Sequence, residues 1–219
     1  MKETDIVTVL TNALTAQDDA RPRTQQKELG PSSVGFCKAR SVFQLLDYPQ
    51  TNKTLRLPAI MGTAIHAVIE EALTGYLDDN FLLELEAPGI PGLIGPAHVD
   101  CYRKSERRVY DWKTSSKRNL RYFPKLGQRW QVMIYGYLLK EAGYEVDEVT
   151  LVAISRDGNE NDIKVHSEPY DERVVAQAFD WQRSVIEYAA SGEIPDPEVH
   201  PNVCKGYCPF YGEICGGKA

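Results

Sequence analysis

Hydrophobic residues recur along the chain with two different spacings, and these spacings predict an alternation of helices and strands. Apolar side chains three or four positions apart predict helices over residues 60–77, 128–141 and 171–190. Shorter segments of alternating or continuous apolar character predict strands over residues 81–86, 98–102, 108–113, 149–155 and 163–166. The order of these elements predicts an α/β fold, with helices packed on a small mixed sheet.

The polar N-terminal segment, residues 1–30, is predicted to form a short helix followed by a mobile stretch. Residues 31–219 are predicted to form one domain, since a chain of this length can bury a single substantial core. Within that domain, Ser32 or Ser33 is expected to cap a helix that continues to Leu46.

The distribution of apolar residues also bears on where the protein acts. No apolar run reaches the roughly 18 residues that a membrane-spanning helix requires. The first residues are too polar and too acidic for a secretory signal. We therefore expect a protein without a membrane partner that acts in the cytoplasm, or in the host cytoplasm if a phage encodes it.

Two carboxylates and an ammonium group lie on the predicted hairpin of residues 98–113. Asp111 and Lys113 are two positions apart on one strand and share a face, and a short hairpin brings Asp100 beside them. Adjacent carboxylates repel one another, and a shared divalent cation relieves that repulsion. Oxygen ligands suit Mg²⁺ or Mn²⁺. The alternative is an ordinary hairpin on which Asp111 pairs with Lys113.

Further polar residues are predicted to lie near this hairpin. His66 lies on the preceding helix and can supply an imidazole ligand, although a single helix histidine is often structural. Glu86 ends the preceding strand and is a candidate ligand for a second metal ion or its water. Gln131 and Tyr135 are four positions apart and share one helix face, either for packing or to orient a phosphate or base.

The cysteine pattern favours metal ligation over disulfides. Three of the five cysteines, Cys204, Cys208 and Cys215, lie in the last sixteen residues, and no secretory signal precedes them. Their spacing alone does not distinguish iron from zinc. Cys37 is the preferred fourth ligand, because Cys101 neighbours Asp100 on a strand and is expected to point away from it.

The net charge of −6 disfavours a nucleic-acid partner at first sight, but residues 103–129 carry ten Lys and Arg against two acids. A local positive segment can bind phosphates on an acidic protein, or it can be a solvated face. Basic side chains interleaved with aromatic rings suit single-stranded nucleic acid. The candidate DNA-binding residues are Lys117, Arg118, Arg121, Tyr122, Lys125 and Arg129.

These features together resemble a known family. The order GTAIH, a strand glutamate, G-x-x-x-x-D, V-Y-D-W-K-T and Q-V-M-I-Y is similar to the RecB-like branch of the PD-(D/E)xK nuclease superfamily. The chain most resembles the iron–sulfur exonucleases of CRISPR-associated systems and their phage relatives. The resemblance implies a restriction-endonuclease-like core, with a helical subregion of N- and C-terminal segments held by an iron–sulfur cluster. Valine replaces the proline that usually precedes the first aspartate.

The resemblance also implies a role for each site residue. His66, Asp100 and Asp111 would bind Mg²⁺ or Mn²⁺, with Trp112 contributing its backbone carbonyl. Lys113 would be the catalytic lysine. The auxiliary helix residues would be Gln131 and Tyr135. The ligands of a [4Fe–4S] cluster, with zinc as the alternative, would be Cys37, Cys204, Cys208 and Cys215.

The function implied is a divalent-metal-dependent DNA exonuclease acting on single-stranded ends in recombination, repair or end processing. The alternatives are a non-catalytic nucleic-acid-binding iron–sulfur module and a processing subunit for CRISPR spacer acquisition. Because the phosphate-binding loop GxxxxGKT is absent from the sequence, unwinding would need another chain. Candidate protein partners are a helicase, a recombinase or an integrase.

Overall fold

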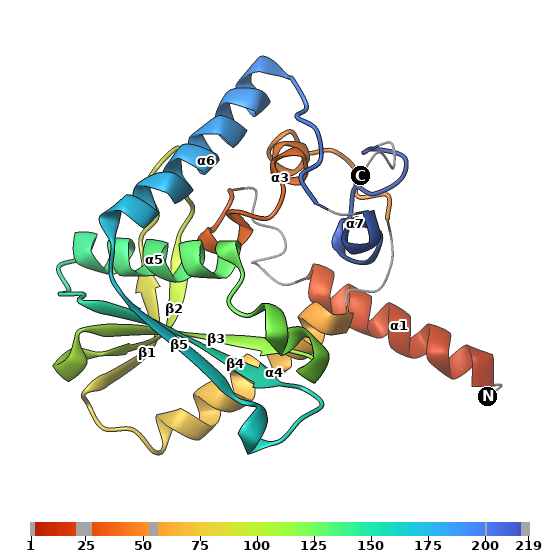
Figure 1. The fold of residues 1–219 in the computed structure, drawn as a ribbon. Coiled ribbons are helices and arrows are strands. Elements are labelled where there is room, and N and C mark those ends of the chain that lie inside the picture. The colour runs from red at the N-terminus through yellow and green to blue at the C-terminus, as the bar shows by residue number, and fades with distance from the viewer. Residues whose placement is uncertain (1–2, 21–27, 53–56, 200, 216–219) are drawn as a thin grey trace.

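The computed structural model describes residues 3–20, 28–52, 57–199 and 201–215, and its centre is a mixed β-sheet in the order β1-β2-β3-β4-β5. The strands are β1 (Phe81–Ala87), β2 (Ala97–Arg103), β3 (Arg108–Ser115), β4 (Glu148–Ser155) and β5 (Lys164–Pro169). Strands β3 and β4 are parallel, and the other neighbouring pairs are antiparallel. The five-stranded sheet flanked by helices (Figure 1) confirms the predicted α/β fold.

Helices cover the sheet and extend beyond it. In the described residues they are α1 (Glu3–Asp19), α3 (Lys38–Leu45), α4 (Leu57–Thr74), α5 (Leu126–Glu141), α6 (Glu172–Ser191) and α7 (Pro201–Tyr207). Short 3-10 turns are η1 (Pro31–Ser33), η2 (Lys104–Glu106), η3 (Lys117–Tyr122) and η4 (Glu160–Asp162). Parallel strands need a crossover, and α5 provides it between β3 and β4. Figure 1 shows α5 along one face of the sheet with α6 outside it, and α4 at the other face.

The main core lies between α5 and the sheet. Helix α5 buries a long set of apolar residues, including Val132, Met133 and Ile134, against strand residues such as Val109 and Leu151. This burial explains the strong periodicity from which the helix was predicted. Helix α4 differs, because none of its residues is fully buried although its sequence is strongly apolar. It is therefore held at the sheet without entering the core.

Strands β2 and β3 separate in the middle of the sheet, and this separation determines where a pocket can form. Their paired residues end at Cys101 and Tyr110, whereas β3 continues to pair with β4 as far as Ser115. Strand β2 instead continues its pairing with β1 as far as Ala97. The side chains just beyond the last β2–β3 pair therefore line an opening between the two strands.

The N- and C-terminal segments meet beside this core. Helix α3 packs on α6, and Phe43 of α3 contacts the ring of Phe210 just beyond α7. Gly35 allows the preceding segment to approach α5 closely. Its φ is +76°, and a Cβ there would lie 2.8 Å from the Trp130 ring and 3.0 Å from Gly127 Cα. A side chain at Gly35 is therefore excluded both by backbone conformation and by space.

The structure corrects one predicted helix. Ser32 and Ser33 do not cap a helix running to Leu46, because they lie in the turn η1, and α3 begins only after its N-cap residue, Cys37. The left-handed Gly35 interrupts the helical path between the two elements. The predicted short N-terminal helix is the seventeen-residue α1, and residues 21–27 of the predicted mobile stretch lie outside the described residues. Helix α7 was not predicted.

No helix in the described part of the chain is both long and apolar enough to cross a membrane.

Candidate active site

Asp100 and Asp111 face each other where β2 and β3 separate. Extending the register of the last printed pair, Cys101 with Tyr110, by one residue places the two aspartates opposite one another. Only 8% of Asp100 and 1% of Asp111 is exposed. The Trp112 backbone N–H donates a 2.6 Å hydrogen bond to Asp100 Oδ2. The Asp100 side chain thus accepts a hydrogen bond from the backbone of β3 at the point where the pairing of β2 with β3 ends.

The most deeply buried carboxylate of the pocket belongs to Asp111. Lys113 Nζ lies 2.8 Å from Asp111 Oδ1 and 2.6 Å from Oδ2, so the expected sharing of one strand face is confirmed. Burial raises the pKa of Asp111 to about 6, with a further rise from Asp100, while the Lys113 ammonium opposes both. Desolvation thus outweighs the ion pair, and Asp111 is held as a carboxylate at some energetic cost.

Helix α4 brings His66 to this pair of aspartates. His66 Nδ1 lies 3.6 Å from Asp100 Oδ2, although strand β1 lies between residues 66 and 100 in the sequence. Gly62, one helical turn earlier, allows α4 to approach β3, because a Cβ there would lie 3.2 Å from Thr114 Oγ1. The small residue of the GTAIH segment therefore permits the approach that places the imidazole at the carboxylates.

Gln131 and Tyr135 reach the same carboxylates from α5. Gln131 Nε2 donates a 2.7 Å hydrogen bond to the Tyr135 hydroxyl and a longer one, 3.4 Å, to Asp111 Oδ1. Both side chains are buried, so the amide and the phenol form a polar group inside an otherwise apolar helix face. The i, i+4 spacing seen in the sequence thus serves a contact with Asp111 as well as packing.

The β1 glutamate that lines this site is Glu84, and Glu86 lies outside the pocket lining. Glu86 is exposed and pairs with His98, which lies two positions from Asp100 along β2. Glu84 lies between the pairs that flank Asp100, so it stands opposite that aspartate, and it lines the pocket. Its φ of +45° departs from strand conformation. Sequence alternation could not separate the two glutamates, because a connection of nine residues leaves the β1–β2 register open.

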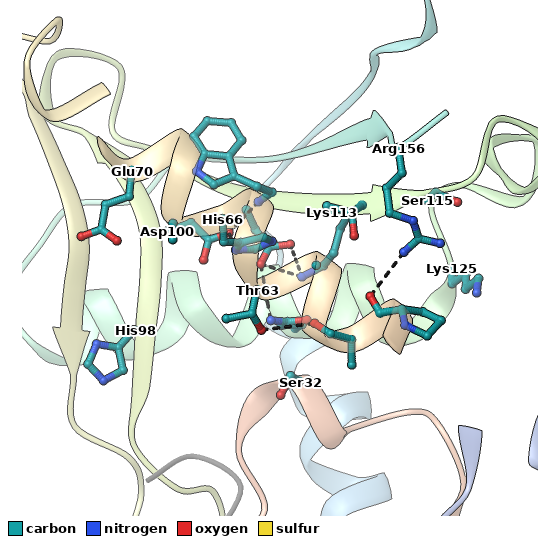
Figure 2. A pocket seen from close by; sticks show the side chains of 18 of the residues that line it. Ser32, Thr63, His66, Glu70, His98, Asp100, Lys113, Ser115, Lys125 and Arg156 are labelled. Carbon is teal, nitrogen blue, oxygen red and sulfur yellow. Dashed lines mark hydrogen bonds and ion pairs between the residues drawn. The ribbon is translucent and has the colours of Figure 1, made fainter. Parts of the chain in front are cut away.

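These side chains line one cavity of about 650 Å³ (Figure 2). Glu70 and His98 lie toward one end of the view, and Ser115, Lys125 and Arg156 lie toward the other. The remaining lining residues include Ser32 from η1 and Tyr207 from α7. Glu70 thus lies at one end of the cavity and the basic residues Lys125 and Arg156 lie at the other, with Asp100 and Lys113 between them.

A divalent cation fits the donor chemistry of the pocket. Asp111 Oδ2 is buried and accepts no hydrogen bond of good geometry, although the Lys113 ammonium lies beside it. Such an oxygen next to a second carboxylate and an imidazole is a set of hard donors suited to Mg²⁺ or Mn²⁺. In the arrangement described, no three His, Cys, Asp or Glu side chains of the described residues are positioned to hold a metal ion, and Lys113 supplies the positive charge.

Four of the five cysteines lie together, as the sequence predicted. Cys37, Cys204 and Cys208 are buried in one small cluster, with Cys215 packed against it. Burial is the main cause that raises the pKa of Cys204, and its cysteine neighbours raise it further. Cys101 is buried elsewhere, in β2. The four thiols are free and close, but they too fall short of a metal-holding arrangement among the described residues.

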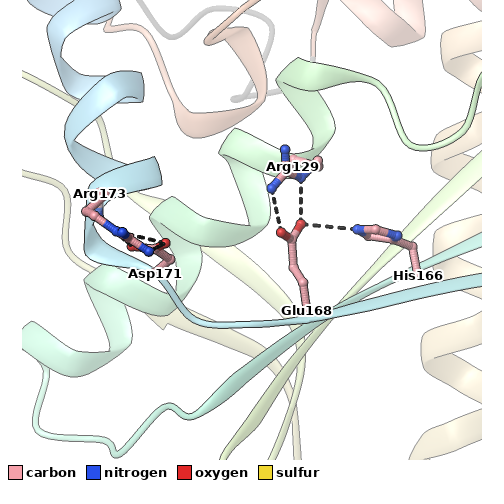
Figure 3. Close-up of polar contacts among 5 residues, drawn as sticks. All are labelled: Arg129, His166, Glu168, Asp171 and Arg173. Carbon is pink, nitrogen blue, oxygen red and sulfur yellow. Dashed lines mark hydrogen bonds and ion pairs between the residues drawn. The ribbon is translucent and has the colours of Figure 1, made fainter.

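The basic residues after β3 divide into two groups. Lys117 pairs with Asp162 at 3.0 Å, and Arg129 makes two hydrogen bonds of 2.7 and 2.5 Å to Glu168, which His166 also contacts (Figure 3). These pairs lower the net charge that Lys117 and Arg129 present to a ligand.

The other predicted DNA-binding residues lie differently. Arg118, Arg121, Tyr122 and Lys125 are exposed, and the Arg121 guanidinium stacks over the Tyr122 ring at 4.6 Å. Lys125 lines the pocket. So does Arg156, which follows β4 and was not among the predicted residues. No signal in the sequence marked Arg156, since it reaches the pocket only because β4 lies beside β3.

Comparison with known proteins identifies the family. None of the curated proteins matches. Among solved structures, SSO0001 is similar in fold, with 20% sequence identity and a TM-score of 0.61 over 98% of both chains. A phage-related exonuclease from Haemophilus somnus 129PT has 12% identity and a TM-score of 0.48, over 75% of this chain and 94% of that one. LHK-Exo in complex with dAMP has 10% identity and a TM-score of 0.45, over 76% of this chain and 89% of that one. The sequence pattern of the PD-(D/E)XK nuclease superfamily matches residues 98–216, more than half of the chain. The chain belongs to the PD-(D/E)XK nuclease superfamily.

Proposed function

We propose that the chain is a divalent-metal-dependent DNA exonuclease that hydrolyses phosphodiester bonds at single-stranded ends, in recombination, repair or end processing. The observation that carries this proposal is the pairing of a nearly inaccessible Asp111 with Lys113, opposite Asp100, in an open pocket. Two adjacent buried carboxylates destabilise the folded protein unless one cation binds both of them. Family membership supplies the reaction class.

The cation would be held by His66, Asp100, Asp111 and the Trp112 carbonyl, with Glu84 rather than Glu86 beside them. When bound, such an ion lowers the pKa of a water ligand and neutralises the scissile phosphate. The Trp112 N–H fixes the Asp100 carboxylate through its 2.6 Å hydrogen bond. The amide of Gln131 likewise restrains Asp111, so the acidic side chains are oriented before substrate arrives.

Lys113 has the second role. Its ammonium is mostly shielded from solvent and lies beside the carboxylate of Asp111. From there it can hold the attacking water and stabilise the charge that develops on the phosphoryl oxygens. The water oxygen forms a new P–O bond in line with the leaving oxygen as the old P–O bond breaks. The water gives up one proton to solvent, and the leaving oxygen takes one from solvent. Low solvent access strengthens these electrostatic contributions.

The proposal is tested by Asp111→Ala in an end-labelled DNA digestion with Mn²⁺. We expect cleavage by the wild-type protein only with the divalent ion, and a loss of about a hundredfold or more in the variant, since a ligand and a buried charge are removed together. Asp180→Ala changes an exposed carboxylate of α6 and is the matched control. DNA binding without hydrolysis by the wild-type protein would instead indicate a binding module.

We further propose that Cys37, Cys204, Cys208 and Cys215 bind a [4Fe–4S] cluster, which joins α3 to the C-terminal segment. The packing of all four cysteines in one cluster supports this proposal, and binding would draw the thiols closer together and deprotonate them. A link between residues so distant in sequence restricts the unfolded chain and has a structural role.

Anaerobic purification with iron and sulfide analysis tests the cluster. We expect about four iron atoms per wild-type chain and a visible absorbance that bleaches on reduction. Cys208→Ser should lose the iron, whereas Cys101→Ser, at a buried cysteine outside the cluster, should keep it. A colourless protein that carries about one zinc ion would contradict the iron–sulfur assignment.

A further inference from the structure

Three segments that are far apart in sequence contribute two basic residues and a tyrosine to the lining of the pocket. Lys125 precedes α5, Arg156 follows β4, and Tyr207 ends α7. All three line the cavity that also contains Asp100, Asp111 and Lys113. Figure 2 shows Arg156 and Lys125 together on the side of Lys113 that lies away from Glu70. A strand with its scissile phosphate at Lys113 would therefore meet Lys125 and Arg156 next.

Lys125 and Arg156 form no direct ion pair among the described residues, although the Arg156 charge helps to lower the pKa of the neighbouring Asp157 carboxyl. The ion pairs of the described residues include Lys117 and Arg129 but neither Lys125 nor Arg156. One Arg156 donor, Nη1, is 3.4 Å from the Pro58 carbonyl of α4, and its backbone N–H donates to the Ser115 carbonyl. A guanidinium has five donors, so this anchoring leaves most of them for a phosphate.

Tyr207 adds an aromatic ring to the lining of the same cavity. Its side chain is 53% exposed, whereas the adjoining Cys208 is buried in the cysteine cluster. Cys204 lies one helical turn earlier in α7 and is buried in the same cluster. The cysteines therefore fix the short helix that carries Tyr207. An accessible ring on a fixed element and two cationic side chains, all lining one cavity, are the combination that binds a nucleotide of a single strand through its base and its phosphate.

We infer that Lys125, Arg156 and Tyr207 bind the nucleotide adjoining the scissile phosphate. The two cations contact the flanking phosphate, and the Tyr207 ring stacks on the base of that nucleotide. The cysteine subregion is then part of the substrate site as well as a structural link. This inference rests on the proposed nuclease function and defines its substrate contact.

Modified oligonucleotides test each contact separately. Kd is measured by fluorescence anisotropy with Ca²⁺ in place of Mn²⁺, and cleavage is measured with Mn²⁺. We expect Arg156→Ala and Tyr207→Ala each to weaken binding of a single strand about tenfold, because a phosphate contact and a base stack are lost. Arg156→Ala should also reduce the dependence of log Kd on log salt by about one phosphate contact.

The modified strands then locate the contacts. A methylphosphonate removes the phosphate charge, and an abasic nucleotide removes the base. At one linkage beside the scissile one, the Arg156→Ala effect should vanish with the methylphosphonate, and the Tyr207→Ala effect should vanish with the abasic nucleotide. The side on which this occurs gives the strand direction. Tyr207→Phe should bind as wild type, since stacking needs only the ring.

Matched controls are Arg183→Ala, on the outer helix α6, and Tyr76→Ala, a highly exposed tyrosine outside the pocket lining. Both should leave Kd unchanged. Wild-type cleavage together with undiminished binding by Arg156→Ala and Tyr207→Ala, or effects that persist on every modified strand, would overturn the inference alone. An inactive wild-type protein that still shows these couplings would overturn the catalytic proposal and leave the binding site standing.

Discussion

Replacement of Lys113 by methionine should slow DNA cleavage on the order of a hundred- to a thousandfold, because one preorganised electrostatic group at a reacting phosphate is lost. Methionine keeps the length and apolar character of the stem, so the strand should fold normally. A second effect follows from the position of Nζ within 3 Å of both Asp111 oxygens. The Lys113 charge lowers the pKa of Asp111, and its removal should shift the pH profile of the remaining activity upward.

The measurement is the single-turnover rate on labelled DNA with Mn²⁺ across a range of pH. Lys113→Arg retains a charge without the same reach and should retain more activity than Lys113→Met. Lys104→Met removes a lysine at the opposite end of the hairpin, in η2, and should leave the rate unchanged. A Lys113→Met protein within about tenfold of wild type would show that the ammonium does not act on the reacting phosphate.

The hairpin at the centre of the site follows from sequence because its information is local. Asp111 and Lys113 share a face through strand geometry alone. The short turn between β2 and β3 fixes the register in which the two strands pair. The same locality explains α5, where Gln131 and Tyr135 keep helical spacing whatever lies around them. The resemblance to the nuclease family implies the role expected of each of these residues.

Other features depend on contacts between distant segments. The choice between Glu84 and Glu86 depends on the register of two strands joined by a turn-rich connection, which the sequence pattern does not specify. Arg156 enters the pocket only through the parallel pairing of β3 with β4. The start of α3 was misplaced because Gly35 adopts a left-handed conformation to approach Trp130, a requirement imposed by packing.

Charge shows the same division between local and tertiary information. The basic character of residues 103–129 is visible in the sequence, but its neutralisation is not. Glu168 on β5 meets Arg129 on α5 only in the folded chain, so counting basic residues overstates the positive surface. The arginines and lysines that contribute most to the positive potential are those that form no ion pair with a carboxylate of another element.

The second large effect concerns stability, and it comes from Asp111. Its pKa is raised from 3.8 to about 6 in the folded protein, mainly by burial. The folded state therefore binds a proton more tightly than the unfolded state, so the free energy of unfolding falls as pH rises through this range. At about 1.4 kcal/mol per pKa unit, the loss by pH 7 approaches 3 kcal/mol without a metal ion. Asp111→Asn resembles the protonated acid and should avoid this loss.

We therefore expect metal-free Asp111→Asn to be more stable than wild type by about 1–3 kcal/mol at pH 7, the lower value allowing for the lost Lys113 ion pair. The difference should shrink toward pH 4, where the wild-type carboxyl is protonated. Urea denaturation in a chelator measures both, with Asp180→Asn as the exposed control. Added Mg²⁺ should stabilise only the wild type, because a cation that binds the folded carboxylate offsets its desolvation.

Equal stabilities of Asp111→Asn and wild type at pH 7, or a stability difference independent of pH, would mean that burial of the Asp111 carboxylate does not destabilise the folded protein. If only added Mg²⁺ closes the stability difference between Asp111→Asn and wild type, the buried Asp111 charge destabilises the fold in order to hold the cation.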